Sequence, residues 1–146
     1  MKKFGIACYL NIVAAILGIV GLFLTVRSST MSADNALTNL STLILAGVVA
    51  IVLVCVAIVA PSRLGNHDPL PTVSVLGAIA LYCYLFGSCV SQRVMLIAGL
   101  FSFNDANTMG WSIFYTCIGA WVCLLLGILL LVIGSFLNSV KEPKAA

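Results

Sequence analysis

Charged side chains are scarce in this sequence, and their scarcity limits the class of protein. The 146 residues contain 7 Lys or Arg, 4 Asp or Glu and 1 His, so charged residues make up 8% of the chain. Soluble domains carry about 25%. The charges divide the chain into four long runs that contain none. Because coupled transporters and proton relays generally place ionisable groups inside the membrane, we do not expect an ion or proton site of that kind.

Sequence patterns that support catalysis or metal binding are also missing. The 6 cysteines form no Cys-x-x-Cys pair. Cys83 and Cys89, like Cys117 and Cys123, are six residues apart, which turns the thiols of each pair about 120° away from each other on a helix. A single histidine does not supply the ligand set of a zinc site. We therefore expect no catalytic residue, cofactor or metal and no enzymatic activity, and the scattered basic residues do not favour nucleic-acid binding.

Apolar residues, in contrast, are abundant and continuous. They make up 62% of the chain, and the mean hydropathy is +1.21. Each charge-free run exceeds the roughly 20 residues that cross about 30 Å of hydrocarbon as a helix. We predict an all-α, polytopic membrane protein whose single domain, residues 1–146, is a four-transmembrane-helix bundle. The predicted helices cover residues 5–26, 38–60, 72–91 and 111–138.

A short extra apolar segment, residues 94–103, lies between the third and fourth predicted helices. About ten residues are too few to span a bilayer, and a third helix continued through them would be too long without a bend or a large tilt. We expect a bend near Arg93, with the segment at the outer face beside an aromatic collar of Trp111, Phe114 and Tyr115. The segment then either caps the bundle or forms a lid or docking face for a partner.

Small and polar residues recur at helical spacing along one face of each predicted helix. Small side chains let transmembrane backbones approach closely, so these faces are expected to point inward in a left-handed bundle. The inward residues predicted in this way are Cys8, Asn11, Ala15, Gly18 and Thr25; Asn39, Ala46, Ala50 and Ala57; Ser74, Gly77, Leu81, Tyr84, Ser88 and Ser91; and Thr116, Ala120, Cys123, Gly127 and Gly134.

The polar members of these faces are the candidate functional residues. They either pack through hydrogen bonds between helices or line a pore. Tyr84 is expected to bond to another helix, because a buried phenol needs a partner. Cys89 and Cys117 are predicted at similar depths, so a structural disulfide between them is considered. The candidate packing or pore-lining residues are Asn11, Ser74, Tyr84, Ser88 and Thr116.

Basic residues are unevenly distributed, which predicts the orientation. The two predicted outer loops contain only one basic residue each, Arg27 and Arg93. Short loops rich in Lys and Arg stay in the cytoplasm. We therefore expect cytoplasmic N- and C-termini and a location in the plasma or inner membrane. The residues on the expected cytoplasmic side are Lys2, Lys3, Arg63, Lys141 and Lys144.

Apolar surface without a chemical motif favours a binding role. We predict a non-enzymatic accessory or scaffold subunit of a membrane complex, whose partners are the lipid bilayer and another membrane protein or a second copy of the chain. The alternative is a small oligomeric pore, channel or transporter component of a holin-like kind. A membrane thiol oxidoreductase ranks third, because the cysteines are buried in apolar surroundings that keep thiols protonated and inert.

Overall fold

Four helices account for nearly all of the described structure. A computed structural model describes residues 5–64, 69–103 and 107–137, apart from the side chains of 62–64 and 103, and in these ranges the chain contains no strand. Each helix is long and apolar enough to cross a membrane, so the predicted all-α, four-helix membrane bundle is confirmed. Most of the charged residues on which the predicted orientation depends lie outside the described residues. These are Lys2, Lys3, the Arg63 side chain, Lys141 and Lys144, and Asp105 lies outside them too. The helices are α1 (Ile6–Thr30), α2 (Leu40–Leu64), α3 (Pro69–Phe103) and α4 (Thr108–Ser135).

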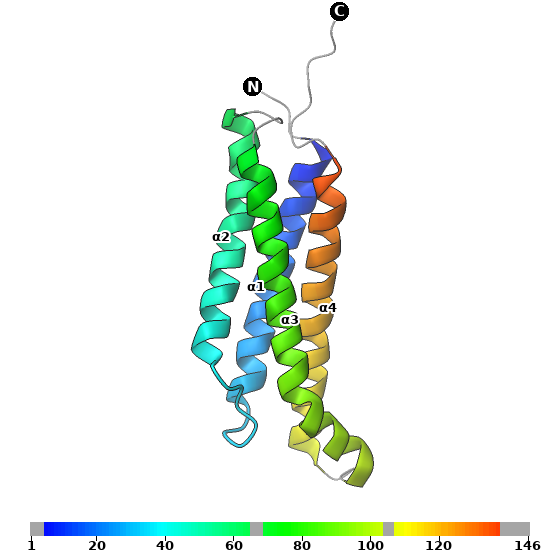
Figure 1. The fold of residues 1–146 in the computed structure, drawn as a ribbon. Coiled ribbons are helices and arrows are strands. Elements are labelled where there is room, and N and C mark those ends of the chain that lie inside the picture. The colour runs from blue at the N-terminus through cyan, green and yellow to red at the C-terminus, as the bar shows by residue number, and fades with distance from the viewer. Residues whose placement is uncertain (1–4, 65–68, 104–106, 138–146) are drawn as a thin grey trace, which may run out of the picture.

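The helices run alternately up and down around a common core (Figure 1). We call the end that holds the start of α1 and the end of α4 the terminal end, and the opposite end, where residues 31–39 join α1 to α2, the loop end. The closest packing is that of α1 against α4 and of α2 against α3, and α1–α2 and α3–α4 contacts complete the ring. The bundle therefore consists of two helix pairs that face each other.

The inward faces of α1 and α4 contain the predicted small residues. All of those predicted in α1 are buried, and in α4 Ala120, Gly127 and Gly134 are buried whereas Thr116 and Cys123 are half-buried. Glycines make room here for side chains from the facing helix. A methyl group added at Gly21, for example, would lie only 3.0 Å from Cγ of Leu124. The buried residues of α4 alternate at spacings of three and four, as in coiled-coil packing: Gly110, Ile113, Cys117, Ala120, Leu124, Gly127, Leu131 and Gly134.

The inward faces of α2 and α3 differ from the prediction. In α2, Ala50 and Ala57 are buried, but Asn39 lies before the helix with a left-handed backbone (φ 58°). In α3, Tyr84 is 48% exposed, and Tyr82 is fully buried in its place. The prediction followed small and polar residues, whereas larger side chains fill this part of the core. Polarity does not mark the interior reliably here, because the outer face of a transmembrane helix is as apolar as its inner face.

Residues 94–103 continue α3 without a break. The helix has 35 residues and so extends about 52 Å, well beyond the thickness of the hydrocarbon layer. Its last turns veer away from the bundle axis at the loop end (Figure 1). Leu100 anchors this extension, because it is 2% exposed and a methyl group added at Gly110 of α4 would lie 2.8 Å from its Cδ2.

Candidate functional site

Tyr82 is fully buried in the middle of the bundle. Its ring inserts from α3 toward α1 and α4, where glycines leave space for it. A methyl group added at Gly18 would collide with the Tyr82 hydroxyl, and one added at Gly127 would lie 3.6 Å from Cε2 of the ring. The hydroxyl is buried and has no hydrogen-bond partner among the described residues. Tyr82 is therefore a packing residue at the point where three helices meet.

Arg93 closes the loop end of the bundle. Although charged, it is 3% exposed, and its guanidinium donates hydrogen bonds to the carbonyl oxygens of Asn35 and Ser28, the latter at 3.0 Å. The Ser28 carbonyl belongs to the last turn of α1, where backbone oxygens lack partners within the helix and carry partial negative charge. The arginine thus donates to an acceptor of α1 and to one of the first loop at the same time. The guanidinium can do this because it carries several donors in one plane.

The loop of residues 31–39 is fastened by two further side chains. Gln92 accepts a hydrogen bond from the Thr38 N–H through Oε1 at 2.6 Å, and Ser29 accepts one from the Leu37 N–H through Oγ at 2.8 Å. Leu37 itself is buried. The loop therefore lies fixed over the helix ends rather than acting as a loose connector.

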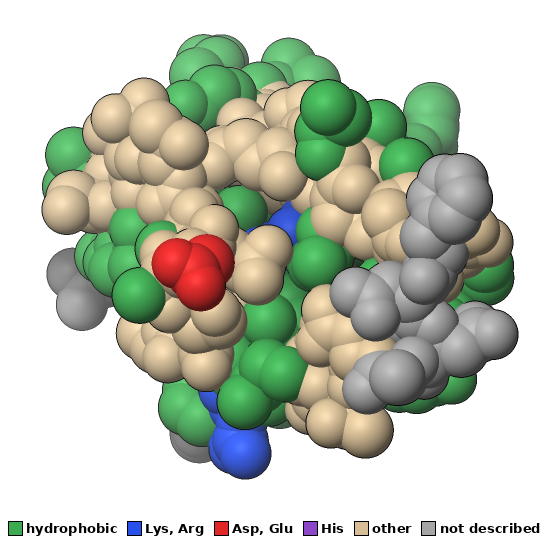
Figure 2. All heavy atoms as spheres, turned by 90° about the horizontal axis from the view of Figure 1, so that it is seen from below, with side chains coloured by type: hydrophobic (Ala, Val, Ile, Leu, Met, Phe, Trp, Pro, Cys, Tyr) green, Lys and Arg blue, Asp and Glu red, His purple; other side chains and the backbone are tan. Residues whose placement is uncertain are grey.

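The surface of the loop end combines apolar and charged groups. Figure 2 looks onto this end and shows hydrophobic side chains through the middle of the face, with basic atoms both in a recess near its centre and at its edge. Arg93 is buried, whereas Arg27 and Asp34 are exposed. Among the described residues, the accessible charges of the loop end are therefore those of Arg27 and Asp34.

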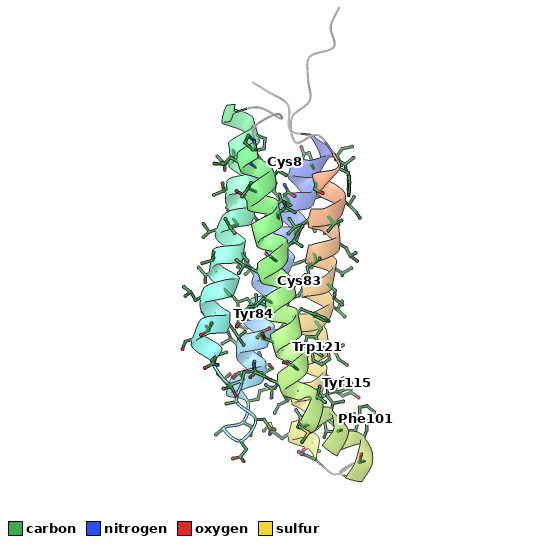
Figure 3. All side chains as sticks on the ribbon, viewed as in Figure 1. Cys8, Cys83, Tyr84, Phe101, Tyr115 and Trp121 are labelled. Carbon is green, nitrogen blue, oxygen red and sulfur yellow. The ribbon has the colours of Figure 1, made fainter. Side chains whose placement is uncertain are left out.

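Four aromatic rings stack where the extension of α3 meets the start of α4. Phe101 contacts Trp111 with ring centroids 5.2 Å apart at 75° and Phe114 at 5.6 Å and 82°, both edge-to-face. Tyr115 completes the group through Trp111 and Phe114. Phe101 and Tyr115 are each 65% exposed and point away from the bundle (Figure 3). We call these four residues the aromatic surface.

A cap residue fixes the start of α4 beside this surface. The side chain of Asn107 accepts a hydrogen bond from the Gly110 N–H at 2.9 Å, which satisfies one of the free donors of the first turn. Aromatic pairs of this geometry contribute about 0.5–1.5 kcal/mol beyond their buried area. Cap and stacking together hold the exposed rings in a defined arrangement.

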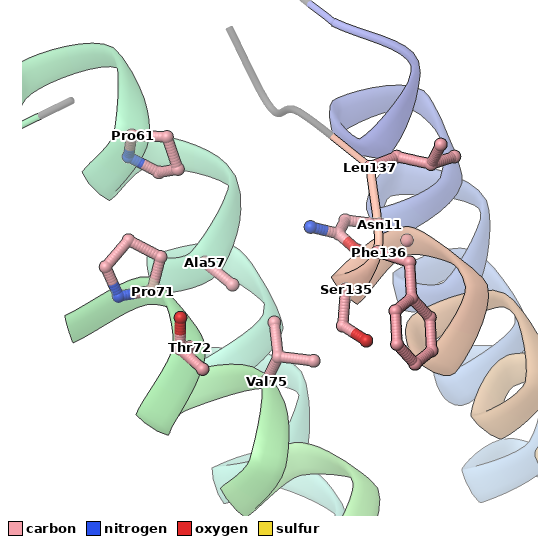
Figure 4. Close-up of a pocket in the computed structure, with 10 residues that line it drawn as sticks. Asn11, Ala57, Pro61, Pro71, Thr72, Val75, Ser135, Phe136 and Leu137 are labelled. Carbon is pink, nitrogen blue, oxygen red and sulfur yellow. The ribbon is translucent and has the colours of Figure 1, made fainter. Parts of the chain in front are cut away.

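A pocket of about 170 Å³ opens between the two helix pairs at the terminal end (Figure 4). Asn11 of α1 lines it, with its amide extended toward α2 and α3. Asn11 is 3% exposed, and its Oδ1 forms no hydrogen bond to any described residue. The other lining residues are Ala57, Pro61, Pro71, Thr72, Val75, Gly134, Ser135, Phe136 and Leu137.

The structure does not bring the predicted pore-lining residues together along one passage. Asn11 and Ser74 are buried, and the Ser74 hydroxyl donates to Leu70 O of its own helix at 2.9 Å. Ser88 and Thr116 are half-buried, and Thr116 donates to Ser112 O at 2.8 Å. Tyr84 lies on the outer surface of α3 (Figure 3), so its predicted bond to another helix is wrong.

All six cysteines are free. Cys89 and Cys117, which the sequence suggested as a disulfide, are both buried thiols. The sulfur of Cys89 lies 3.8 Å from Oγ1 of Thr25. The suggested disulfide is therefore absent from this structure. Over the described ranges, no three His, Cys, Asp or Glu residues are grouped so that they could hold a metal ion.

Sequence reasoning missed two residues that organise the interior, Tyr82 and Arg93. A signal for Arg93 exists, because it is the one charged residue in the apolar stretch of α3, and charged residues inside such segments generally face the bundle and find partners. Tyr82 belongs to a heptad-like series with Val75, Ala78 and Leu85, which a search for large rather than small inward residues finds.

Comparison of the chain with protein-family models, with curated proteins and with solved structures finds no match.

Proposed function

We propose that this chain is a non-enzymatic accessory or scaffold subunit that binds another membrane protein through the aromatic surface at the loop end. The observation that carries the proposal is the exposure of Phe101 and Tyr115, each 65%, in a cluster that stacking holds in place. Protein interfaces are enriched in Trp, Tyr and Phe, and a few such residues usually supply most of the binding energy.

The length of α3 supports this location for the contact. The extension beyond Arg93 adds turns that the bundle does not need for crossing the membrane, and only Leu100 among its described residues is buried. The rings are already ordered by contacts within the chain, so a partner that binds them loses little side-chain entropy. Preorganised, exposed aromatic residues are suited to recognition of an apolar partner helix.

We also propose that the terminal end faces the cytoplasm, which puts the aromatic surface on the opposite side of a plasma or inner membrane. The support is the excess of Lys and Arg in the segments next to the terminal end of the bundle. A reporter fused to the C-terminus, active in only one compartment, tests this orientation. Activity on the non-cytoplasmic side would contradict it.

The binding proposal is tested by purifying the tagged protein in mild detergent and analysing the eluate by native mass spectrometry. We expect a stoichiometric membrane-protein partner that the Phe101→Ala variant loses. Phe23→Ala is the matched control, because Phe23 is 62% exposed on α1 and forms no ring contact among the described residues. The control variant should retain the partner.

Two results would contradict the binding proposal. Equal recovery of the partner with Phe101→Ala and Phe23→Ala would mean that the aromatic surface is not the contact. Elution of the wild-type protein alone, as a defined homo-oligomer, would favour the pore alternative. Solute flux through liposomes would then be measured. Tyr82 fills the centre of each bundle, so a channel would have to lie between subunits.

A further inference from the structure

The pocket at the terminal end has a buried floor and an exposed mouth. Its volume of about 170 Å³ is smaller than the roughly 300–1,000 Å³ of sites for drug-sized ligands. Asn11, Ala57 and Val75 belong to the floor and are buried. The pocket therefore admits a small molecule or one part of a larger one. Its exposed lining residues lie on α3 and at the end of α4, so the mouth opens between the ends of these helices (Figure 4): Thr72, Ser135, Phe136 and Leu137.

The side-chain amide of Asn11 directs its donors into this pocket. Its oxygen lies against α4, because a methyl group added at Gly134 would be 3.1 Å from Oδ1. Its nitrogen points the other way, toward α2 and α3 (Figure 4). Asn11 is 3% exposed, and its amide forms no hydrogen bond with any described residue. Because buried polar groups are normally hydrogen-bonded, an acceptor is expected in the pocket.

The lining favours an acceptor without charge. Every described residue that lines the pocket is uncharged, so a carboxylate or phosphate would find no cationic partner among them. Burying an unpaired charge is costly. A carbonyl oxygen is neutral and has two lone pairs that accept hydrogen bonds. The Thr72 hydroxyl adds a second type of donor at the mouth, and a carbonyl group therefore fits the donors and the lack of charge together.

The position of the pocket along the bundle matches the depth of lipid ester groups. Arg27, which is exposed near the end of α1, marks the loop-end boundary of the apolar part of this helix. Asn11 lies about 24 Å before Arg27 along α1, so the pocket mouth is close to the opposite edge of the roughly 30 Å of hydrocarbon. Acyl ester linkages lie at this edge, between the hydrocarbon chains and the headgroups.

We propose that the pocket around Asn11 binds the carbonyl oxygen of a neutral ester group, supplied either by the acyl linkage of a membrane lipid or by a free small ester. Asn11 Nδ2 donates to the carbonyl oxygen, and the alkyl part of the ester contacts Phe136 and Leu137 at the mouth. The proposal is independent of the aromatic surface, which lies at the opposite end of the bundle.

The test follows the side-chain amide signals of Asn11 by NMR in the full-length protein with ¹⁵N-labelled asparagine. Bicelles of diacyl phosphatidylcholine are compared with bicelles of the dialkyl ether analogue, which has the same headgroup and chain length but no carbonyl group. Methyl acetate, a small free ester, is then titrated into both. The side-chain amide of Asn107 is the internal control, because it caps α4 at the loop end and its signals should not change.

Two outcomes support the proposal and distinguish the sources of the ester. If the lipid ester occupies the pocket, the Asn11 signals differ between the two bicelles, and methyl acetate shifts them only in the ether bicelles. If only a free ester binds, the Asn11 signals agree in the two bicelles, and methyl acetate shifts them saturably in both.

A variant at the mouth connects these shifts to the pocket. Thr72→Phe should abolish the ester-dependent shift of the Asn11 signals, because the larger side chain obstructs the entrance. Val73→Phe is the matched control, since Val73 is the next residue, is 65% exposed and does not line the pocket. If Thr72→Phe does not fold, Ser135→Phe takes its place, because Ser135 is exposed on the other side of the mouth.

Three results would overturn the proposal. Asn11 signals that neither differ between the bicelles nor respond to methyl acetate would mean that the pocket holds water only. An ester-dependent shift that persists in a folded Thr72→Phe or Ser135→Phe variant would place the ester outside the pocket. Equal shifts of the Asn107 and Asn11 signals would show an effect of the bilayer on the whole protein.

Discussion

The guanidinium of Arg93 donates a hydrogen bond of 3.0 Å to the backbone carbonyl of Ser28, which lies 65 positions earlier in the sequence. The contact joins the loop-end part of α3 to the last turn of α1, and the same guanidinium also holds Asn35 in the first loop. The charge is tolerated in a buried position because its partners are carbonyl oxygens at a helix C-terminus, which carries partial negative charge.

Arg93→Lys is expected to release the first loop while keeping the charge. A lysine is a compact point charge and does not bridge two carbonyl groups as the guanidinium fork does. Loss of a hydrogen bond to a charged group costs about 1.5–3 kcal/mol, so amide exchange of Leu37 and Thr38 should accelerate about tenfold or more. Hydrogen exchange measured by mass spectrometry checks this. Arg27→Lys, an exposed control, should leave the exchange unchanged.

Gly18→Ala is expected to destabilise the bundle by about 1–3 kcal/mol, as overpacking of a filled core does. The added methyl group would collide with the Tyr82 hydroxyl. Gly87→Ala is the matched control, because nothing lies within 4 Å of a methyl group added there and alanine is the better helix former. Unfolding of the purified protein in detergent mixtures, followed by tryptophan fluorescence, compares the two. Equal stability of both variants would contradict the packing of Tyr82 against α1.

Tyr82→Phe is expected to keep or raise the stability, by up to about 1–3 kcal/mol. The reason is that the buried hydroxyl has no partner in the described part of the chain, and removing an unsatisfied polar group removes its desolvation cost. The ring remains to fill the space beside Gly18 and Gly127. The same unfolding measurement applies. A clear loss of stability would show that the hydroxyl has a partner, such as a bound water molecule.

Thiol labelling is expected to follow burial in the bundle. Cys55 and Cys83 are exposed on the outer surface, whereas Cys8, Cys89 and Cys117 are buried. A membrane-permeable maleimide should therefore modify Cys55 and Cys83 first, and a water-soluble maleimide should modify all of them slowly in bilayers. Mass spectrometry of the digested protein identifies the order. Rapid labelling of Cys89 would instead support the thiol oxidoreductase alternative.

The number of helices could be predicted from the sequence because length and hydropathy alone indicate which segments can cross a bilayer. The continuation of α3 to Phe103, beyond the predicted end at residue 91, could not. The inward face of α1 could also be predicted, since its small residues, among them Gly18, are where another helix must approach closely. Both predictions rest on properties of a single segment and need no knowledge of its neighbours.

Features that depend on two or more helices could not be predicted. Whether Tyr82 or Tyr84 points inward depends on the glycines of α1 and α4 that receive the ring, and the two tyrosines look alike within α3. Arg93 was expected at a bend in an outer loop, because a lone charge gives no indication that α1 and the first loop provide carbonyl partners. The pocket around Asn11 arises only where residues from all four helices meet.

The most direct measurement for the proposed function is photocrosslinking in intact membranes. A photoreactive amino acid is placed at Val94, which is 51% exposed and lies one heptad before Phe101 on the same side of α3. Val73, 65% exposed and three heptads before Val94, is the matched control at the terminal end of the same helix. The account predicts one discrete protein adduct from position 94 that Phe101→Ala abolishes, and none from position 73. Adducts with lipid alone at position 94, or the same protein adduct from both positions, would contradict it.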